Sequence, residues 1–174
     1  FASRRPDVMV YETEPLEEAL TLVGPLLAEL WVSTSGTDSD WVVKLVDVFP
    51  PDTPDHPGLP RGVPMGGYEM MVRSEVIRGR FRTSPERPEA FVPAEPTLVR
   101  FPLQDVFHTF RPGHRIQIQI QSSWFPLVDR NPQTFVENIF LAREEDFQKA
   151  TQRIYRSPAF PSGIQVLILP GEGR

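Results

Sequence analysis

The stretch FPLQDVFHTFRPGHRIQIQIQSSWFPLVDRN, residues 101–131, decides the fold of this chain, because a proline-glycine turn within it leads into an alternating strand. From Ile116 to Gln121, isoleucine and glutamine take alternate positions. Successive side chains of an extended backbone point to opposite faces, so the isoleucines pack on one layer and the glutamines meet solvent or a polar neighbour. The pattern predicts a half-buried antiparallel strand and a structure of packed sheets.

The rest of the chain has the same strand-like character. Further runs occur at residues 7–13, 20–23, 26–33, 41–49, 68–82, 97–103 and 164–169, and Gly24-Pro25 divides the second from the third. Pro102 predicts an edge or terminal strand, and Gly79 predicts a bulge or a close backbone approach. Only residues 144–152 read as a short helix. About nine short strands without a βαβ rhythm predict an all-β, jelly-roll β-sandwich of the galactose-binding-domain-like type, with at most one or two short helices.

Length and composition exclude several classes of protein. With 174 residues, residues 1–174 are expected to form a single domain. The net charge of −5 argues against nucleic-acid binding, and no apolar run is long enough to span a membrane. Because the chain has no cysteine, it has no disulfide framework, and its cellular location stays open between cytoplasm and periplasm or secretion. It begins at Phe1 without an apolar signal segment, so we expect a piece of a longer protein.

The chain lacks the common catalytic motifs. It has no G-x-S-x-G pentapeptide, phosphate-binding loop, dinucleotide fingerprint, H-E-x-x-H or EF-hand loop. His56, His108 and His114 fall in loop or turn contexts, and the rings of the last two are expected to bond neighbouring backbone carbonyls. Asp38 and Asp40 supply too few oxygens for calcium and are expected to cap a turn. We therefore expect no catalytic residue, no cofactor and no metal site.

A contact surface is expected directly after the alternating strand. Adjacent aromatic side chains of an extended chain face opposite ways, so at most one of Trp124 and Phe125 is buried in the core, and the other needs a second surface. Asp129 and Arg130 are expected to pair locally or to lock this loop against Arg115. We predict that Trp124, Phe125, Asp129 and Arg130 make an interdomain contact.

The other two tryptophans, Trp31 and Trp41, are expected to pack in the core or between the sheets. An alternative is that exposed tryptophans, Trp31 and Trp124, form an aromatic shelf for sugars.

Four long segments, in this order and at this spacing, resemble one family of hydrolases. They are residues 28–50 (AELWVSTSGTDSDWVVKLVDVFP), 68–82 (YEMMVRSEVIRGRFR), 105–134 (DVFHTFRPGHRIQIQIQSSWFPLVDRNPQT) and 150–158 (ATQRIYRSP). The resemblance is to the C-terminal domain of X-Pro dipeptidyl-peptidase and cocaine-esterase-like serine hydrolases, and the wording is most similar to α-amino acid ester hydrolases and cephalosporin acylases.

This resemblance implies a non-catalytic jelly roll that packs on an α/β-hydrolase catalytic domain of the same parent chain, helps to wall its substrate pocket and makes oligomer contacts. The family's serine, aspartate and histidine triad and its oxyanion tyrosine lie upstream and correspond to no position here. The chain alone is therefore expected not to be an enzyme, although its parent is expected to be an esterase, acylase or X-Pro dipeptidyl-peptidase. Two alternatives stay open, a stand-alone carbohydrate- or ligand-binding β-sandwich and a module used purely for assembly.

Overall fold

The computed structural model describes residues 2–58, 60 and 62–170, so positions 1, 59, 61 and 171–174 of the expected single domain lie outside the described residues. The strands are β1 (Val8–Glu12), β2 (Leu20–Thr34), β3 (Asp40–Val48), β4 (Glu69–Arg78), β5 (Thr97–Phe110), β6 (Arg115–Gln121), β7 (Gln152–Ile154), β8 (Arg156–Ser157), β9 (Phe160–Pro161) and β10 (Gly163–Ile168). Four single 3-10 turns complete the set, η1 (Ala2–Arg4), η2 (Gly79–Phe81), η3 (Ile139–Leu141) and η4 (Glu144–Asp146).

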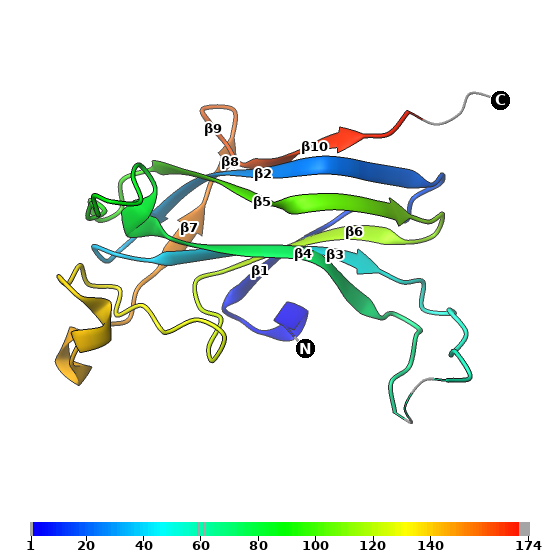
Figure 1. Ribbon diagram of the computed structural model, residues 1–174, viewed down its shortest axis with the longest axis horizontal. Coiled ribbons are helices and arrows are strands. Elements are labelled where there is room, and N and C mark those ends of the chain that lie inside the picture. Colours follow the sequence, from blue (N-terminus) through cyan, green and yellow to red (C-terminus); the bar gives the residue numbers. More distant parts are fainter. Residues whose placement is uncertain (1, 59, 61, 171–174) are drawn as a thin grey trace.

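Eight of the strands in the described residues form a β-sandwich of two antiparallel sheets, which confirms the predicted fold class, and β8 and β9 form a separate two-stranded ladder. The first sheet has the order β1-β6-β3-β4, and the second has the order β10-β2-β5, with β7 paired to one end of β2. Figure 1 shows β10, β2 and β5 side by side, with the irregular connections gathered at the two ends of the strands. No helix among the described residues is long and apolar enough to cross a bilayer. The prediction of a short helix at residues 144–152 is wrong, since only η4 forms there and β7 begins at Gln152.

The stretch that decided the fold behaves as its sequence predicts. His114 N–H donates to the Arg111 carbonyl across Pro112-Gly113, and Gly113 has a φ of 82°. This is a type II turn, with proline and glycine in the two positions that favour them. It joins β5 of the second sheet to β6 of the first, and β6 pairs with both β1 and β3.

The core lies between the two sheets. Ile120 on β6, Trp41 and Leu45 on β3, and Leu30 on β2 are all 4% exposed or less. The pattern of alternating burial extends along β2, where Leu26, Ala28, Leu30 and Val32 all face inward. Trp41 therefore packs in the core as expected, whereas Trp31 alternates to the outer face of the second sheet, so the prediction of core packing is wrong for Trp31.

Two strands are longer than the sequence suggested. The runs divided by Gly24-Pro25 are one strand, because Gly24 takes a φ of 74° and a register shift there lets β2 continue. β5 likewise continues past Pro102, which pairs with Leu27. β5 is an edge strand of its sheet, as the proline predicted. His108 is therefore a strand residue and not a loop residue.

Gly79 marks a close approach, as expected. A Cβ atom there would lie 2.5 Å from the Phe91 ring and 2.6 Å from the Ser39 carbonyl oxygen. This glycine lets the chain leave β4 and pass directly under the segment that contains Phe91.

Candidate functional site

Residues 122–131, which contain the four predicted contact residues, follow β6 and turn back through a bond from Val128 N–H to the Trp124 carbonyl. Trp124 is half-buried, and the Lys44 Nζ lies 4.3 Å from the centre of its ring. Phe125 points away from the core and is 65% exposed. The two neighbouring aromatic residues therefore face different environments, as the spacing predicted.

Asp129 and Arg130 do not lock the loop against Arg115. The Asp129 carboxylate lies 3.9 Å from Nη2 of Arg78. Arg115 stands at the opposite end of β6, where it pairs with Glu12 and Glu14, so that part of the prediction is wrong.

A further apolar surface, which we call the end surface, surrounds this segment. It consists of Phe125, Leu127, Phe140, Leu141 and Phe147, which are between 39% and 76% exposed. The Arg130 guanidinium lies 5.9 Å from the Phe125 ring and 5.5 Å from the Phe147 ring, and so joins two members of the surface.

Arg78 occupies an open pocket of about 690 Å³ beside the end surface. The pocket walls include Phe81, Val136, Phe140 and Leu141. The Arg78 Nη1 atom is buried and has no hydrogen-bond partner within the described part of the chain. A buried guanidinium N–H without an acceptor is costly, so this nitrogen lowers the stability of the fold.

The outer face of the second sheet is also apolar, and we call it the sheet face. It comprises Val23, Leu27, Trp31, Leu98, Phe107 and Leu167, which alternate with the inward side chains of their strands. Leu167, Val23 and Phe107 form one cross-strand row, and Trp31 pairs with Leu98 in another. Phe107 is 78% exposed, and an ion pair between Glu29 and Arg100 lies between the rows.

The outer face of the first sheet is polar but largely buried. Gln117 donates to Glu12 and Gln119 donates to Gln117, each at 2.7 Å, while Lys44 donates to Gln121 Oε1 at 3.4 Å. The glutamines therefore meet polar neighbours rather than solvent. Lys44 is only 7% exposed, and burial lowers the pKa of its ammonium group.

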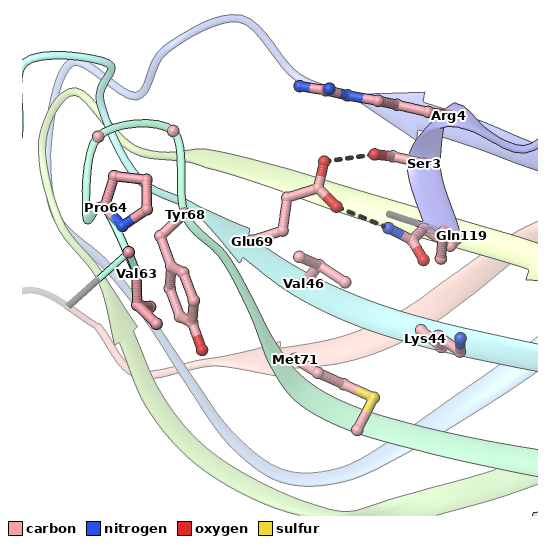
Figure 2. Close-up of a pocket in the computed structure, with 14 residues that line it drawn as sticks. Ser3, Arg4, Lys44, Val46, Val63, Pro64, Tyr68, Glu69, Met71 and Gln119 are labelled. Carbon is pink, nitrogen blue, oxygen red and sulfur yellow. Dashed lines mark hydrogen bonds between the residues drawn. The ribbon is translucent and has the colours of Figure 1, made fainter. Parts of the chain in front are cut away.

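Beside these glutamines lies a cleft of about 510 Å³. Figure 2 shows Glu69 in this cleft between Ser3 and Gln119, which donate to its two carboxylate oxygens at 2.6 and 3.4 Å. Both carboxylate oxygens therefore already accept hydrogen bonds from within the chain.

Other side chains of this chain contact the rings of both tryptophans of the proposed sugar shelf. The Trp31 ring centre lies 5.1 Å from that of Phe160, and one face of Trp124 is covered by Lys44. The most exposed aromatic side chains of the described residues are instead phenylalanines such as Phe107 and Phe125.

Asp38 and Asp40 belong to a buried ionic cluster at the end of the sandwich next to β4. Asp38 accepts from Ser39 N–H at 2.9 Å, which is the expected capping bond, and also pairs with Arg80 at 2.7 Å. Asp40 accepts from Asn131 Nδ2 at 2.8 Å. Within residues 2–58, 60 and 62–170, no group of three or more potential ligands is arranged for a metal ion.

Burial raises the pKa of Asp40 to about 6, against the opposing effects of the Asn131 hydrogen bond and the Arg78 charge. The ordinary value is 3.8, so between pH 4 and 6 the folded state holds a proton that the unfolded state has released. This carboxyl therefore lowers the stability of the fold as the pH rises through that range.

His108 and His114 converge on one buried carboxylate at the opposite end of the sandwich. His108 Nε2 lies 2.9 Å from Asp47 Oδ2, and His114 Nδ1 lies 2.7 Å from Asp47 Oδ1. Both rings thus bond a side chain rather than the backbone carbonyls that the sequence suggested. Neither histidine has a serine or threonine hydroxyl as a partner in the described hydrogen-bond network. The cluster joins β3, β5 and the turn before β6.

Sequence reasoning missed Asp47, Arg78 and Lys44. Asp47 had a usable signal, since it continues the inward series of Trp41, Val43 and Leu45 and is the polar residue in that series. Arg78 and Lys44 had none, because the contacts of both side chains depend on the arrangement of residues far apart in the chain.

Comparison with known proteins identifies relatives for nearly the whole chain. The sequence pattern described as "X-Pro dipeptidyl-peptidase C-terminal non-catalytic domain" matches residues 1–165. Cocaine esterase from Rhodococcus sp. (strain MB1 Bresler) is 34% identical over 167 residues, which are 95% of this chain and 26% of that protein.

Two solved structures are also similar. An aminopeptidase from the marine sediment archaeon Thaumarchaeota archaeon has a TM-score of 0.90 and 47% identity over 97% of this chain and 26% of its own. An α-amino acid ester hydrolase has a TM-score of 0.88 and 49% identity over 95% of this chain and 26% of its own. The chain thus spans about a quarter of the length of these relatives.

Proposed function

We propose that this chain, which belongs to the family of X-Pro dipeptidyl-peptidase C-terminal non-catalytic domains, is the accessory domain of a longer serine hydrolase. In this proposal residues 1–174 form one domain that packs on the α/β-hydrolase catalytic domain of the same parent chain. The parent is an esterase, acylase or X-Pro dipeptidyl-peptidase. The three-quarters of each relative that this chain does not cover leave room for such a partner.

The observation that carries the proposal is the sheet face. Six apolar side chains lie on one outer face of the second sheet, and Phe107, Leu167 and Leu98 are 78%, 57% and 40% exposed. Apolar surfaces of this kind on a soluble chain mark sites where another protein surface binds. A catalytic domain of the same parent would cover this face and remove the apolar side chains from water.

The end surface supplies the second part of the proposed contact. Phe125 and Leu127 are exposed there, and Arg130 and Asp129 offer charges at its rim, which is the usual distribution in an interface. The residues predicted from sequence, Trp124, Phe125, Asp129 and Arg130, remain part of this proposal. Trp124 acts as the anchor that fixes the segment to the first sheet. In this proposal the end surface helps to form the substrate pocket and makes oligomer contacts.

Site-specific alkylation tests the contact, because the chain has no cysteine of its own. The variants Phe107→Cys and Phe125→Cys are made in the isolated chain and in the complete hydrolase, with Met9→Cys on β1 as the control. Alkylation at each position is followed by mass spectrometry. We expect the first two to react more slowly in the complete hydrolase and the control to react equally. Equal rates at Phe107→Cys in both proteins would contradict packing through the sheet face.

Activity of the isolated chain tests its non-catalytic role. The purified chain is expected not to hydrolyse aminoacyl esters or X-Pro peptides. Robust hydrolysis that a serine-directed inhibitor abolishes would contradict the proposal.

A further inference from the structure

The two long edges of the sandwich differ. On one edge β4 lies against β5, and Arg73 Nε donates to the Asp105 carbonyl at 2.6 Å, which ties the two sheets together. On the other edge, where β1 of the first sheet faces β10 of the second, a cavity of about 200 Å³ opens between them. It is lined by Leu30, Ile118, Ile120, Ile154 and Ile164, with Tyr11, Arg156, Ser162 and Gly163 around them.

This cavity reaches the core itself. Leu30 and Ile120 are 1% and 4% exposed, yet both line it. Its walls are branched aliphatic side chains from both sheets. A cavity of about 150 Å³ with such walls stays dry and binds benzene. The present cavity is therefore of the size and polarity to hold one phenyl ring or a short branched alkyl group.

A cation stands at the cavity without a counter-ion. The Arg156 guanidinium lies 4.8 Å from the centre of the Tyr11 ring, and no carboxylate forms an ion pair with Arg156 among residues 2–58, 60 and 62–170. The Ser162 hydroxyl is not free to bind a ligand, because it already accepts a hydrogen bond from the Trp31 N–H and donates one to the Trp31 carbonyl. An anionic group on a ligand would supply the ion-pair partner that the Arg156 guanidinium lacks.

We propose that the β1–β10 edge is a binding site for a small carboxylic acid with an apolar body of about phenyl size. The apolar body lies between the sheets against the isoleucines, and the carboxylate pairs with Arg156. The site is separate from the sheet face and from the end surface, so it does not depend on the proposed docking of a catalytic domain.

The isoleucines of the chain provide the measurement and its internal control. Of eight isoleucines, Ile118, Ile120, Ile154 and Ile164 line the cavity, and Ile77, Ile116, Ile139 and Ile168 do not. In the chain with ¹³C-labelled isoleucine methyl groups, phenylacetate is titrated and followed by NMR. We expect saturable shifts confined to the first four, with a Kd on the order of 1 mM for a ligand of about ten non-hydrogen atoms.

Two further probes separate the contributions of the carboxylate and of the phenyl ring to binding. Benzyl alcohol has the ring without the carboxylate, and acetate has the carboxylate without the ring. Arg156→Gln is expected to weaken phenylacetate binding about tenfold and to leave benzyl alcohol unchanged. Arg153→Gln on β7 is the matched control and should change neither. Ile118→Phe fills the cavity and should abolish both, and Ile164→Phe serves if the first variant does not fold.

Several results would overturn the proposal. These are uniform shifts at all eight isoleucines, an absence of saturation, or unchanged binding after the cavity is filled. Equal affinity for benzyl alcohol and phenylacetate would refute the proposed ion pair between the ligand carboxylate and Arg156. If the four methyl groups shifted only in the complete hydrolase and never with the probe, the cavity would hold a side chain of the partner domain, and the proposal would be wrong.

Discussion

Replacing Arg80 tests how strongly the buried ionic cluster holds the sandwich together. Its side chain is 4% exposed and that of Asp38 is fully buried, with Nη2 and Oδ2 2.7 Å apart. Arg80 also donates to the Val136 carbonyl at 2.8 Å. Removing one partner of a buried pair leaves an uncompensated charge and costs about 3–5 kcal/mol. Arg80→Met should therefore lower the free energy of unfolding by about 4 kcal/mol.

Urea unfolding of the chain, followed by tryptophan fluorescence, measures this loss. With a slope of about 2 kcal/mol per M urea, 4 kcal/mol corresponds to a fall of roughly 2 M in the midpoint. Arg100→Met is the matched control, because its pair with Glu29 lies on the surface, with the arginine side chain 55% exposed. Such surface pairs contribute at most about 1 kcal/mol.

A second substitution separates the charge from the packing. Adding Asp38→Asn to Arg80→Met removes the stranded carboxylate and keeps the oxygen that accepts from Ser39 N–H. The double variant should therefore be more stable than Arg80→Met alone. If Arg80→Met costs no more than Arg100→Met, or if Asp38→Asn lowers the stability of the first variant further, the reasoning is refuted.

Three further predictions concern single buried sites. As the pH rises from 4 to 6, the raised pKa of Asp40 lowers the free energy of unfolding by up to about 3 kcal/mol, and Asp40→Asn should remove this pH dependence because it removes the carboxyl group. An unchanged pH profile of urea midpoints would contradict this. Asp47→Asn should cost about 2–4 kcal/mol in thermal or urea unfolding, because it weakens both imidazole contacts, and a loss below 1 kcal/mol would count against the cluster. Gly36→Ala would place a Cβ atom 2.1 Å from the Gln133 carbonyl oxygen and should cost about 1–3 kcal/mol, whereas Gly163→Ala, with open space around it, should be nearly neutral by the same measurement.

The sequence predicted those parts of the fold that depend on neighbouring residues. The alternation in β6, the Pro112-Gly113 turn and the edge position of Pro102 each follow from local backbone preferences and were confirmed. The division of β2 at Gly24 was wrong, because a positive φ can produce a bulge as readily as a break, and pairing with β5 decides between them. Sequence patterns therefore located the strands better than they located their ends.

The candidate site was predictable only in part, for a related reason. The different environments of Trp124 and Phe125 follow from their adjacency in the chain. The surroundings of Arg78 do not, since they depend on where Asp129, Phe140 and the end of β4 come together. The role of Asp47 likewise requires a residue of β5 and one of the next turn. Contacts between residues this far apart leave no local pattern.

The positions of charged and apolar side chains separate stability from partner binding. The two buried ionic clusters lie at the ends of the sandwich, Asp47 with its histidines at one end and Arg80 with Asp38 at the other. Phe107 is 78% exposed, so replacing it removes almost no buried contact within this chain. An effect of Phe107→Ser on the complete hydrolase would therefore report on docking, because the fold of this chain does not depend on that side chain. Arg80 gives the converse, since its variant should destabilise the sandwich without altering the sheet face directly.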